Sequence, residues 1–267
     1  MNSTAPNFEK LLELAKNAAL QAGKEILKVY NSDDFGVESK SDESPLTKAD
    51  KAAHYKIVEL LADSNLPILS EEGAEVPFEE RSKWSYFWMV DPLDGTKEFI
   101  KRNGEFTVNI ALIHKGCSVM GVVYTPVVNE LFYAYNSIGA YKVDSLGVHK
   151  LSSLEPENLN GLRVVASRSH LNEETKSFMG KLVEPEGVSM GSSLKFLAIA
   201  DQKADVYPRY APTMEWDSAA AHAICSVLGI EVMNLETQLP VQYNKENLLN
   251  PYFVVGATSL LRKLDLK

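Results

Sequence analysis

A short acidic motif at the end of an apolar run constrains this chain more than any other stretch. The run Tyr86–Val90 predicts a buried strand, and Asp91, Pro92, Leu93 and Asp94 follow it directly. Because a proline fixes its own φ and biases the preceding residue toward an extended conformation, we expect the strand to end before Pro92 and the chain to turn. The turn would aim Asp91, Asp94 and the Leu93 carbonyl at one point, and hard divalent cations prefer such oxygen ligands. An ordinary surface turn, for which Asp, Pro and Gly are also typical, remains equally compatible with these residues alone.

The bulk composition narrows the class of protein. The chain has 267 residues, of which 45% are hydrophobic and 24% charged, so it is predicted to be globular, as one large domain or two packed halves. Its net charge of −9 argues against a surface that binds nucleic acid polymers, although a local site can still bind a small anion. Cys117 and Cys225 lack CxxC spacing, which argues against a disulfide framework or a zinc site and favours a reducing cytosol. Charges interrupt the first apolar segment, Phe8–Tyr30, so neither a signal peptide nor a transmembrane span is expected.

Hydrophobic periodicity predicts two halves of different architecture. Residues 1–150 are predicted to form an α+β half, with helices over 7–30 and 47–63, a loop or loose hairpin between them, a short strand over 67–70 and an antiparallel meander over 105–150. Residues 151–267 are predicted to form an α/β half with strands over 163–167, 187–190, 204–207, 230–233 and 252–256, and helices over 172–182, 192–201, 217–228 and 258–264.

Further acidic residues lie where predicted elements begin or end. Glu71 and Glu72 follow the strand predicted over 67–70, which repeats the design of the opening motif. Asp217 begins the helix predicted over 217–228, where it is either an N-cap or a metal ligand. Asp50 stands three residues after Thr47 and matches a capping box, so the local pattern alone favours a structural role.

The second half of the chain offers groups suited to a phosphate. Ser192, Ser193 and Lys195 lie at a predicted helix start, where free backbone N–H groups and the helix dipole favour an anion. A serine cap beside a solvated lysine is the alternative for that stretch. Arg209 follows a predicted strand and carries the side chain that binds phosphate in a bidentate manner. His170 lies in a hydroxyl-rich loop and is considered only as a substrate contact.

The combined pattern predicts metal-assisted hydrolysis of a phosphate ester. Four carboxylates lie at element ends, where open α/β sheets collect their ligands, namely Glu71, Asp91, Asp94 and Asp217. An all-oxygen, anionic ligand set without Cys or His favours magnesium over zinc. Cationic side chains in the same half as Asp217 would face the phosphate.

Three motifs resemble the signatures of the lithium-sensitive inositol monophosphatase superfamily, and the resemblance covers essentially the whole chain. They are Glu71-Glu72, Asp91-Pro-Leu-Asp94-Gly-Thr96 and Trp216-Asp217-x-Ala-Ala, in the order and at the separations of the family. Other stretches resemble the CysQ-type 3′(2′),5′-bisphosphate nucleotidases, namely Asp94-Gly-Thr-Lys-Glu-Phe-Ile, Gly191-Ser-Ser-Leu-Lys-Phe196 and Tyr207-Pro-Arg209. Inositol monophosphatases usually have Gly-Thr-Thr-Asn-Phe after the second Asp, so Lys97-Glu98 departs toward the nucleotidases.

The resemblance implies a fold and a catalytic centre. The fold would be the layered sugar-phosphatase fold, in which helices alternate with two sheets (αβαβα). Two or three Mg²⁺ ions would be held by Glu71, Asp91, the Leu93 carbonyl, Asp94 and Asp217. Asp50 would hydrogen-bond Thr96, and this pair would act with Glu71 to activate the attacking water. That role outweighs the capping-box interpretation of Asp50.

The resemblance also implies how the substrate is held. The matched substrate-binding positions are Asp94, Gly95, Thr96, His170, Ser192, Lys195, Arg209 and Asp217. The predicted activity is Mg²⁺-dependent hydrolysis of the 3′-phosphate of adenosine 3′,5′-bisphosphate to AMP and phosphate. It would extend to 3′-phosphoadenylyl sulfate and would serve sulfur assimilation and nucleotide recycling. Two alternatives remain, a phosphatase of the same superfamily for inositol monophosphate or a sugar bisphosphate, and a non-catalytic sensor of the nucleotide.

The partners follow from the same resemblance. We expect a small nucleotide substrate, no nucleic acid polymer and a cytoplasmic location. Peripheral association with the inner membrane stays open, as does the choice between a monomer and a homodimer.

Overall fold

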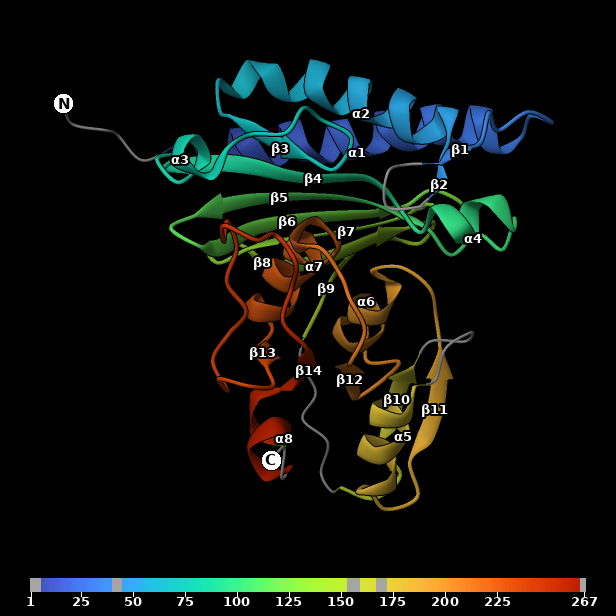
Figure 1. The fold of residues 1–267 in the computed structure, drawn as a ribbon, viewed down its shortest axis with the longest axis vertical. Helices are drawn as coiled ribbons and strands as arrows, with labels where there is room; N and C mark the ends of the chain where they lie inside the picture. The colour runs from blue at the N-terminus through green and yellow to red at the C-terminus, as the bar shows by residue number, and fades with distance from the viewer. Residues whose placement is uncertain (1–5, 40–44, 153–158, 167–171, 265–267) are drawn as a thin grey trace.

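Two β-sheets separate three layers of helices (Figure 1). The computed structural model describes residues 6–39, 45–152, 159–166 and 172–264. Helices α1 (Phe8–Tyr30) and α2 (Lys48–Leu61) cover the outer face of the large sheet, and α6 (Leu194–Ala200) and α7 (Glu215–Val227) lie between the sheets. Helices α5 (Glu173–Gly180) and α8 (Thr258–Lys263) pack on the far side of the small sheet. The layered αβαβα fold that the sequence predicted is therefore confirmed.

The large sheet has seven strands in chain order, of which the first two are parallel and the others antiparallel. They are β3 (Ile68–Ser70), β4 (Tyr86–Asp94), β5 (Thr107–His114), β6 (Cys117–Thr125), β7 (Glu130–Tyr135), β8 (Gly139–Asp144) and β9 (Gly147–Lys150). Side chains of β4 alternate between two cores: Phe87 and Met89 join the cluster around α7, whereas Trp88 and Val90 join the cluster around α1 and α2. Because both faces of β4 are buried, its sequence is continuously apolar.

The predicted end of β4 is wrong. The strand continues through Pro92 to Asp94, and its pairing with β5 shifts register between Asp91, opposite Asn109, and Asp94, opposite Thr107. Such an irregularity lets a strand accommodate a proline and redirect its side chains. The acidic motif of residues 91–94 is thus the bulged end of a strand and not a separate turn.

The small sheet has the order β11-β10-β12-β14-β13. Its strands are β10 (Arg163–Ala166), β11 (Glu186–Ser189), β12 (Val206–Arg209), β13 (Ile230–Asn234) and β14 (Phe253–Ala257). Strand β12 pairs with β14 along its length but with β10 only at Val206. That open side accommodates Pro208, which has no backbone N–H. Arg209 is therefore the last residue of the strand, whereas the sequence had placed it after the strand.

The remaining elements are short. They are β1 (Glu38–Ser39), β2 (Pro45–Leu46), the 3₁₀ turn η1 (Ala62–Ser64), α3 (Phe78–Arg81) and α4 (Thr96–Ile100). Strands β1 and β2 pair antiparallel, as expected for a loose hairpin, whereas the sequence did not predict α3. Among the described residues, no helix has both the length and the apolar character needed to cross a bilayer. Helix α7 packs on β5 and β6 of the large sheet and also on β13 of the small one, so the two predicted halves share a core. Their division into separate domains stays a prediction.

Helix α7 lies so close to the large sheet that a methyl group would not fit at one position. A Cβ on Gly121 of β6 would lie 2.0 Å from the Ala220 carbonyl oxygen. We expect Gly121→Ala to lower the free energy of unfolding by about 1–3 kcal/mol, because backbone cannot move aside as a side chain can. Gly180→Ala is the matched control: a Cβ there meets nothing within 4 Å, and alanine favours a helix by up to about 1 kcal/mol. Urea unfolding of both variants tests the expectation, and equal stabilities would contradict it.

Candidate active site

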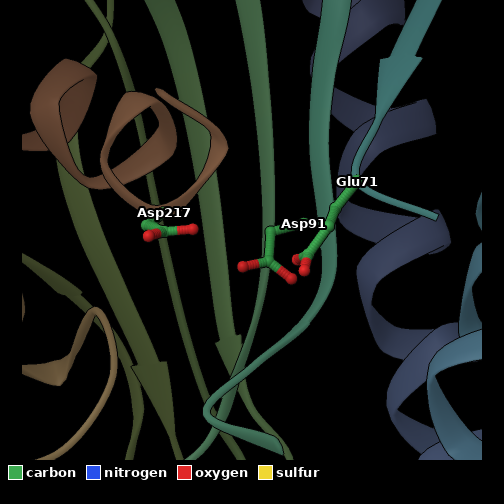
Figure 2. A group of neighbouring side chains, drawn as sticks. All are labelled: Glu71, Asp91 and Asp217. Carbon is green, nitrogen blue, oxygen red and sulfur yellow. The ribbon is translucent and has the colours of Figure 1, made fainter. Parts of the chain in front are cut away.

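Three carboxylates converge between the large sheet and α7. Figure 2 shows Glu71, Asp91 and Asp217 pointing toward one another from β3, β4 and α7. Glu71 follows β3 directly, and its N–H donates to the Val90 carbonyl at 3.1 Å, which extends the pairing with β4. One carboxylate oxygen from each of the three residues lies within 4.8 Å of the others. This spacing allows one cation to contact all three.

Burial and mutual repulsion make the cluster costly without a cation. Burial raises the pKa of Asp91 well above its usual range, and the carboxylates of Glu71, Asp94 and Asp217 raise this pKa further. Burial also raises the pKa of Asp217, as do Asp94 and Glu71, whereas the backbone N–H of Met214 and the charge of Arg209 lower it. Buried carboxylates this close together do not all ionise readily unless a positive charge compensates them. The donor set, all oxygen and anionic, fits a hard divalent cation.

Asp94 lies beside this cluster but turns one oxygen toward the second half of the chain. Its Oδ2 accepts from Ser192 Oγ at 2.7 Å, from Ser193 N at 2.7 Å and from Ser193 Oγ at 2.8 Å. The Leu93 N–H donates to Asp91 Oδ1 at 3.0 Å, and the Leu93 carbonyl oxygen lies 3.4 Å from Thr96 Oγ1. The hydrogen bonds of Asp94 therefore link the acidic motif of residues 91–94 to the serine turn, residues 191–193, that precedes α6.

The sequence named Ser193 only as one of a pair of serines suited to a phosphate and gave it no contact to the carboxylates. Its Oγ accepts from Asn109 Nδ2 at 2.9 Å and lies 2.8 Å from Asp94 Oδ2 and 2.7 Å from the Asp217 carbonyl oxygen. Its side chain is buried, whereas Ser192 is half-buried and has a positive φ of 51°. The only sequence signal was the paired serine at a helix start, which does not show which hydroxyl faces inward.

Asp50 uses its two oxygens for two different tasks. Oδ2 accepts from Thr47 N at 2.7 Å and from Thr47 Oγ1 at 2.5 Å, which forms the predicted capping box at the start of α2. Oδ1 accepts from Thr96 Oγ1 at 3.0 Å, which is the pair that the family resemblance implied. The two interpretations of Asp50 thus coexist. Burial raises the pKa of this carboxyl, while hydrogen bonds from Thr47 and Thr96 lower it in part.

Asp217 is not the N-cap of its helix. Helix α7 begins at Glu215, with Met214 in the N-cap position, so Asp217 is its third residue. The Met214 N–H donates to Asp217 Oδ2 at 2.9 Å. A carboxylate at the third position satisfies one of the free N–H groups of the helix start and faces its positive end. The prediction was off because two residues that are poor N-cap markers, Met214 and Glu215, precede it.

Two cavities meet over the carboxylates. The acidic cavity, of about 490 Å³, is lined by Glu71 and Thr96 among other residues. The cationic cavity, of about 400 Å³, is lined by Ser192, Lys195 and Arg209 among others. The lining residues common to both cavities are Asp94, Gly95, Glu98, Thr213 and Asp217. A single ligand can therefore span the acidic side and the cationic side.

Lys195 and Arg209, two of the cationic residues that line the cationic cavity, have hydrogen-bond donors available for an anion. Burial lowers the pKa of Lys195 to about 8, although Asp94 and Glu98 oppose this shift. Lys195 Nζ donates to the Ser192 carbonyl at 2.9 Å, which leaves two of its protons for a ligand. The Arg209 guanidinium donates to the Pro212 carbonyl at 3.0 Å, but its buried Nε has no hydrogen-bond partner among the described residues. An unsatisfied buried donor beside a cavity indicates a place for an acceptor.

Of the remaining predicted substrate contacts, the structure describes Gly95 but not His170. Gly95 precedes α4 with a φ of 97°, and a Cβ there would lie 3.0 Å from the Glu105 carbonyl oxygen, so glycine is required. It lines both cavities, as a residue that approaches a phosphate must. His170 lies outside the described residues, so its predicted contact stays a prediction.

Comparison with known proteins agrees with the motifs. The model of the inositol monophosphatase family matches residues 7–264. The curated 3′(2′),5′-bisphosphate nucleotidase CysQ of Shigella flexneri is 44% identical over 253 residues, which cover 93% of this chain and 99% of the relative. The CysQ of Escherichia coli strain K12 is 43% identical over 253 residues with the same coverage.

Solved structures show the same relationship. The crystal structure of CysQ from Bacteroides thetaiotaomicron, a bacterial member of the inositol monophosphatase family, aligns with a TM-score of 0.85 at 44% identity, covering 94% of this chain and 98% of that one. The suhB protein of Bartonella henselae, with a TM-score of 0.75 at 22% identity, shares the fold. The chain therefore belongs to the inositol monophosphatase family and, within it, to the CysQ-type 3′(2′),5′-bisphosphate nucleotidases.

Proposed function

We propose that this protein hydrolyses the 3′-phosphate of adenosine 3′,5′-bisphosphate to give AMP and phosphate. The observation that supports this most is the pair of joined cavities, with carboxylates and Thr96 on one side and Lys195 and Arg209 on the other. A nucleotide with two phosphates fits such a site, because one phosphate can react at the acidic side while the cations hold the other. The same reasoning extends to 3′-phosphoadenylyl sulfate, which carries the same 3′-phosphate.

The proposal includes Mg²⁺ at the carboxylate cluster, with two or three ions in the full site. The holders would be Glu71, Asp91, the Leu93 carbonyl, Asp94 and Asp217, whose oxygens fit a hard cation. When bound, a divalent cation there neutralises phosphate charge, makes a nearby water more acidic and stabilises the leaving oxygen.

The chain itself supplies a proton acceptor. Because Thr96 Oγ1 donates to Asp50 Oδ1, its lone pairs are free to face the acidic cavity that it lines. Thr96 Oγ1 can then take a proton from the attacking water as its own proton passes to Asp50 Oδ1. Burial raises the pKa of Asp50, and this makes the carboxylate a better proton acceptor.

Hydrogen-bond donors of the cationic cavity would bind the part of the nucleotide that does not react. Lys195 Nζ, the unpartnered Arg209 Nε and the Ser192 hydroxyl would hold the second phosphate and the sugar. His170 is proposed as a further contact. The Gly95 and Thr96 N–H groups would face the reacting phosphate from the start of α4.

The test is a Mg²⁺-dependent phosphate-release assay on three substrates, with and without lithium. We expect the highest kcat/KM for adenosine 3′,5′-bisphosphate, compared with inositol monophosphate and fructose 1,6-bisphosphate. A preference for either of the other two would replace the proposal with a related phosphatase. Binding of the nucleotide without any turnover would identify a sensor.

Lys195 gives this proposal a pH signature. Since its pKa is about 8 in the folded protein, its ammonium loses its charge well below the usual range for lysine. We expect the KM for adenosine 3′,5′-bisphosphate to rise as pH passes through about 8, while the KM for 3′-AMP changes less. Arginine stays charged, so Lys195→Arg should move this rise to higher pH. An unchanged pH profile in that variant would show that another group is responsible.

A further inference from the structure

Glu98 occupies the junction of the two cavities. It is the third residue of α4, is half-buried and lines both the acidic cavity and the cationic cavity. It also belongs to the Lys97-Glu98 pair that separates this chain from the usual inositol monophosphatase sequence.

The position of the Glu98 side chain is set by contact with the serine turn. A Cβ on Gly191 would lie 3.0 Å from Glu98 Cγ, so Glu98 packs against the turn only because residue 191 is glycine. Glu98 and Lys195 line the same cavity, and Glu98 raises the pKa of Lys195 electrostatically. In the described part of the chain the Glu98 carboxylate makes no direct hydrogen bond or ion pair, and it acts on Lys195 only through its charge.

An unpaired carboxylate beside an anion subsite repels the ligand unless the ligand donates a hydrogen bond to it. Ionised phosphates have no proton to donate, whereas a sugar hydroxyl does. If the reacting phosphate lies in the acidic cavity and the rest of the nucleotide in the other, the sugar lies at the junction. The group there that can donate to Glu98 is the hydroxyl on the carbon next to the reacting ester.

We propose that Glu98 is a specificity-determining residue that accepts a hydrogen bond from the sugar hydroxyl adjacent to the reacting phosphate. It would select ribonucleotides over 2′-deoxyribonucleotides, and the inference rests on the proposed function. With the deoxy substrate no group of the ligand donates to the carboxylate, so the penalty is that of a lost hydrogen bond to a charged acceptor.

The experiment compares kcat/KM for adenosine 3′,5′-bisphosphate and its 2′-deoxy analogue in the wild type, Glu98→Gln and Glu98→Ala. Because the bond involves a charged acceptor, we expect the wild type to prefer the ribonucleotide by about tenfold to hundredfold. Glu98→Gln keeps an acceptor oxygen without charge and should show a smaller preference. Glu98→Ala should show a ratio near one.

The controls separate the possible failures. Glu79→Gln removes an exposed carboxylate that lines neither cavity and should keep the wild-type ratio. If Glu98→Ala retains the full preference, or slows both nucleotides equally, Glu98 does not contact the hydroxyl and the inference is wrong while the proposed function stands. If the wild type hydrolyses neither nucleotide, the proposed function is wrong and the inference is lost with it. Thermal unfolding of the variants shows whether each is folded, and Glu98→Gln serves if Glu98→Ala is not.

Discussion

Replacing Asp91 with Asn is expected to lower kcat by about a thousandfold or more, which corresponds to ~4 kcal/mol of transition-state stabilisation. Asp91 is one of three carboxylates close enough to hold one cation, so the substitution removes an anionic ligand of the proposed metal site. The substitution preserves shape, and the Asn side-chain oxygen can still accept from the Leu93 N–H as Asp91 Oδ1 does. Phosphate release at saturating Mg²⁺ measures the effect.

The same substitution should have the opposite effect on stability without metal. The pKa of Asp91 is raised, so between its ordinary value of 3.8 and its folded value the native state binds more protons than the unfolded state. Stability is therefore lost as pH rises through that range, and Asn has no such loss. We expect Asp91→Asn to raise Tm at neutral pH in EDTA, by about 2–4 °C for each kcal/mol of repulsion removed. Full activity, or a lower Tm with EDTA, would refute the assignment of this cluster as a metal site.

Thr96→Val should have the second largest effect, a loss of about 10²–10⁴-fold in kcat. Valine keeps the shape of the side chain but removes the hydroxyl that donates to Asp50 Oδ1 at 3.0 Å. Without it the attacking water has no acceptor in contact with Asp50. Because substrate binding depends on other groups, KM should change far less than kcat.

Thr47→Val is the matched control, because Thr47 donates to the other oxygen of the same carboxylate. That change removes a helix cap and should cost ~1 kcal/mol of stability while leaving most of kcat. If the two variants lost kcat equally, Asp50 would act by fixing the helix start, and the proposed proton path through Thr96 would be wrong.

Much of the fold could be predicted from the sequence because burial imposes a period. The alternation of helix and strand along residues 163–264 and the antiparallel meander of the first half are confirmed. The end of β4 was predicted wrongly, since a local rule for proline does not show that β5 pairs across the irregularity at Asp94. Short α3 has too few residues to show a period.

The candidate site also has a part that could be predicted from the sequence and a part that could not. Carboxylates at strand ends and at a helix start were predicted from residue type and position, and the structure brings Glu71, Asp91 and Asp217 together. The contacts of Ser193 were not predicted because they come from Asn109 and Asp94, each more than 80 residues away in the chain. Local sequence carries no signal for such contacts, which arise only when the two sheets pack around α6 and α7.

The hydrolytic residues and the substrate-binding residues come from different segments of the chain, and this affects how such proteins can diverge. Glu71, Asp91 and Thr96 come from the end of β3, the end of β4 and the start of α4, whereas Ser192 and Arg209 come from a separate segment around α6 and β12. Mutations of Arg209, whose guanidinium donates to the Pro212 carbonyl, can alter which ester is held, whereas loss of Ser192 would also remove a hydrogen bond to Asp94. Gene copies can therefore inherit an unchanged hydrolytic centre and drift toward new metabolites.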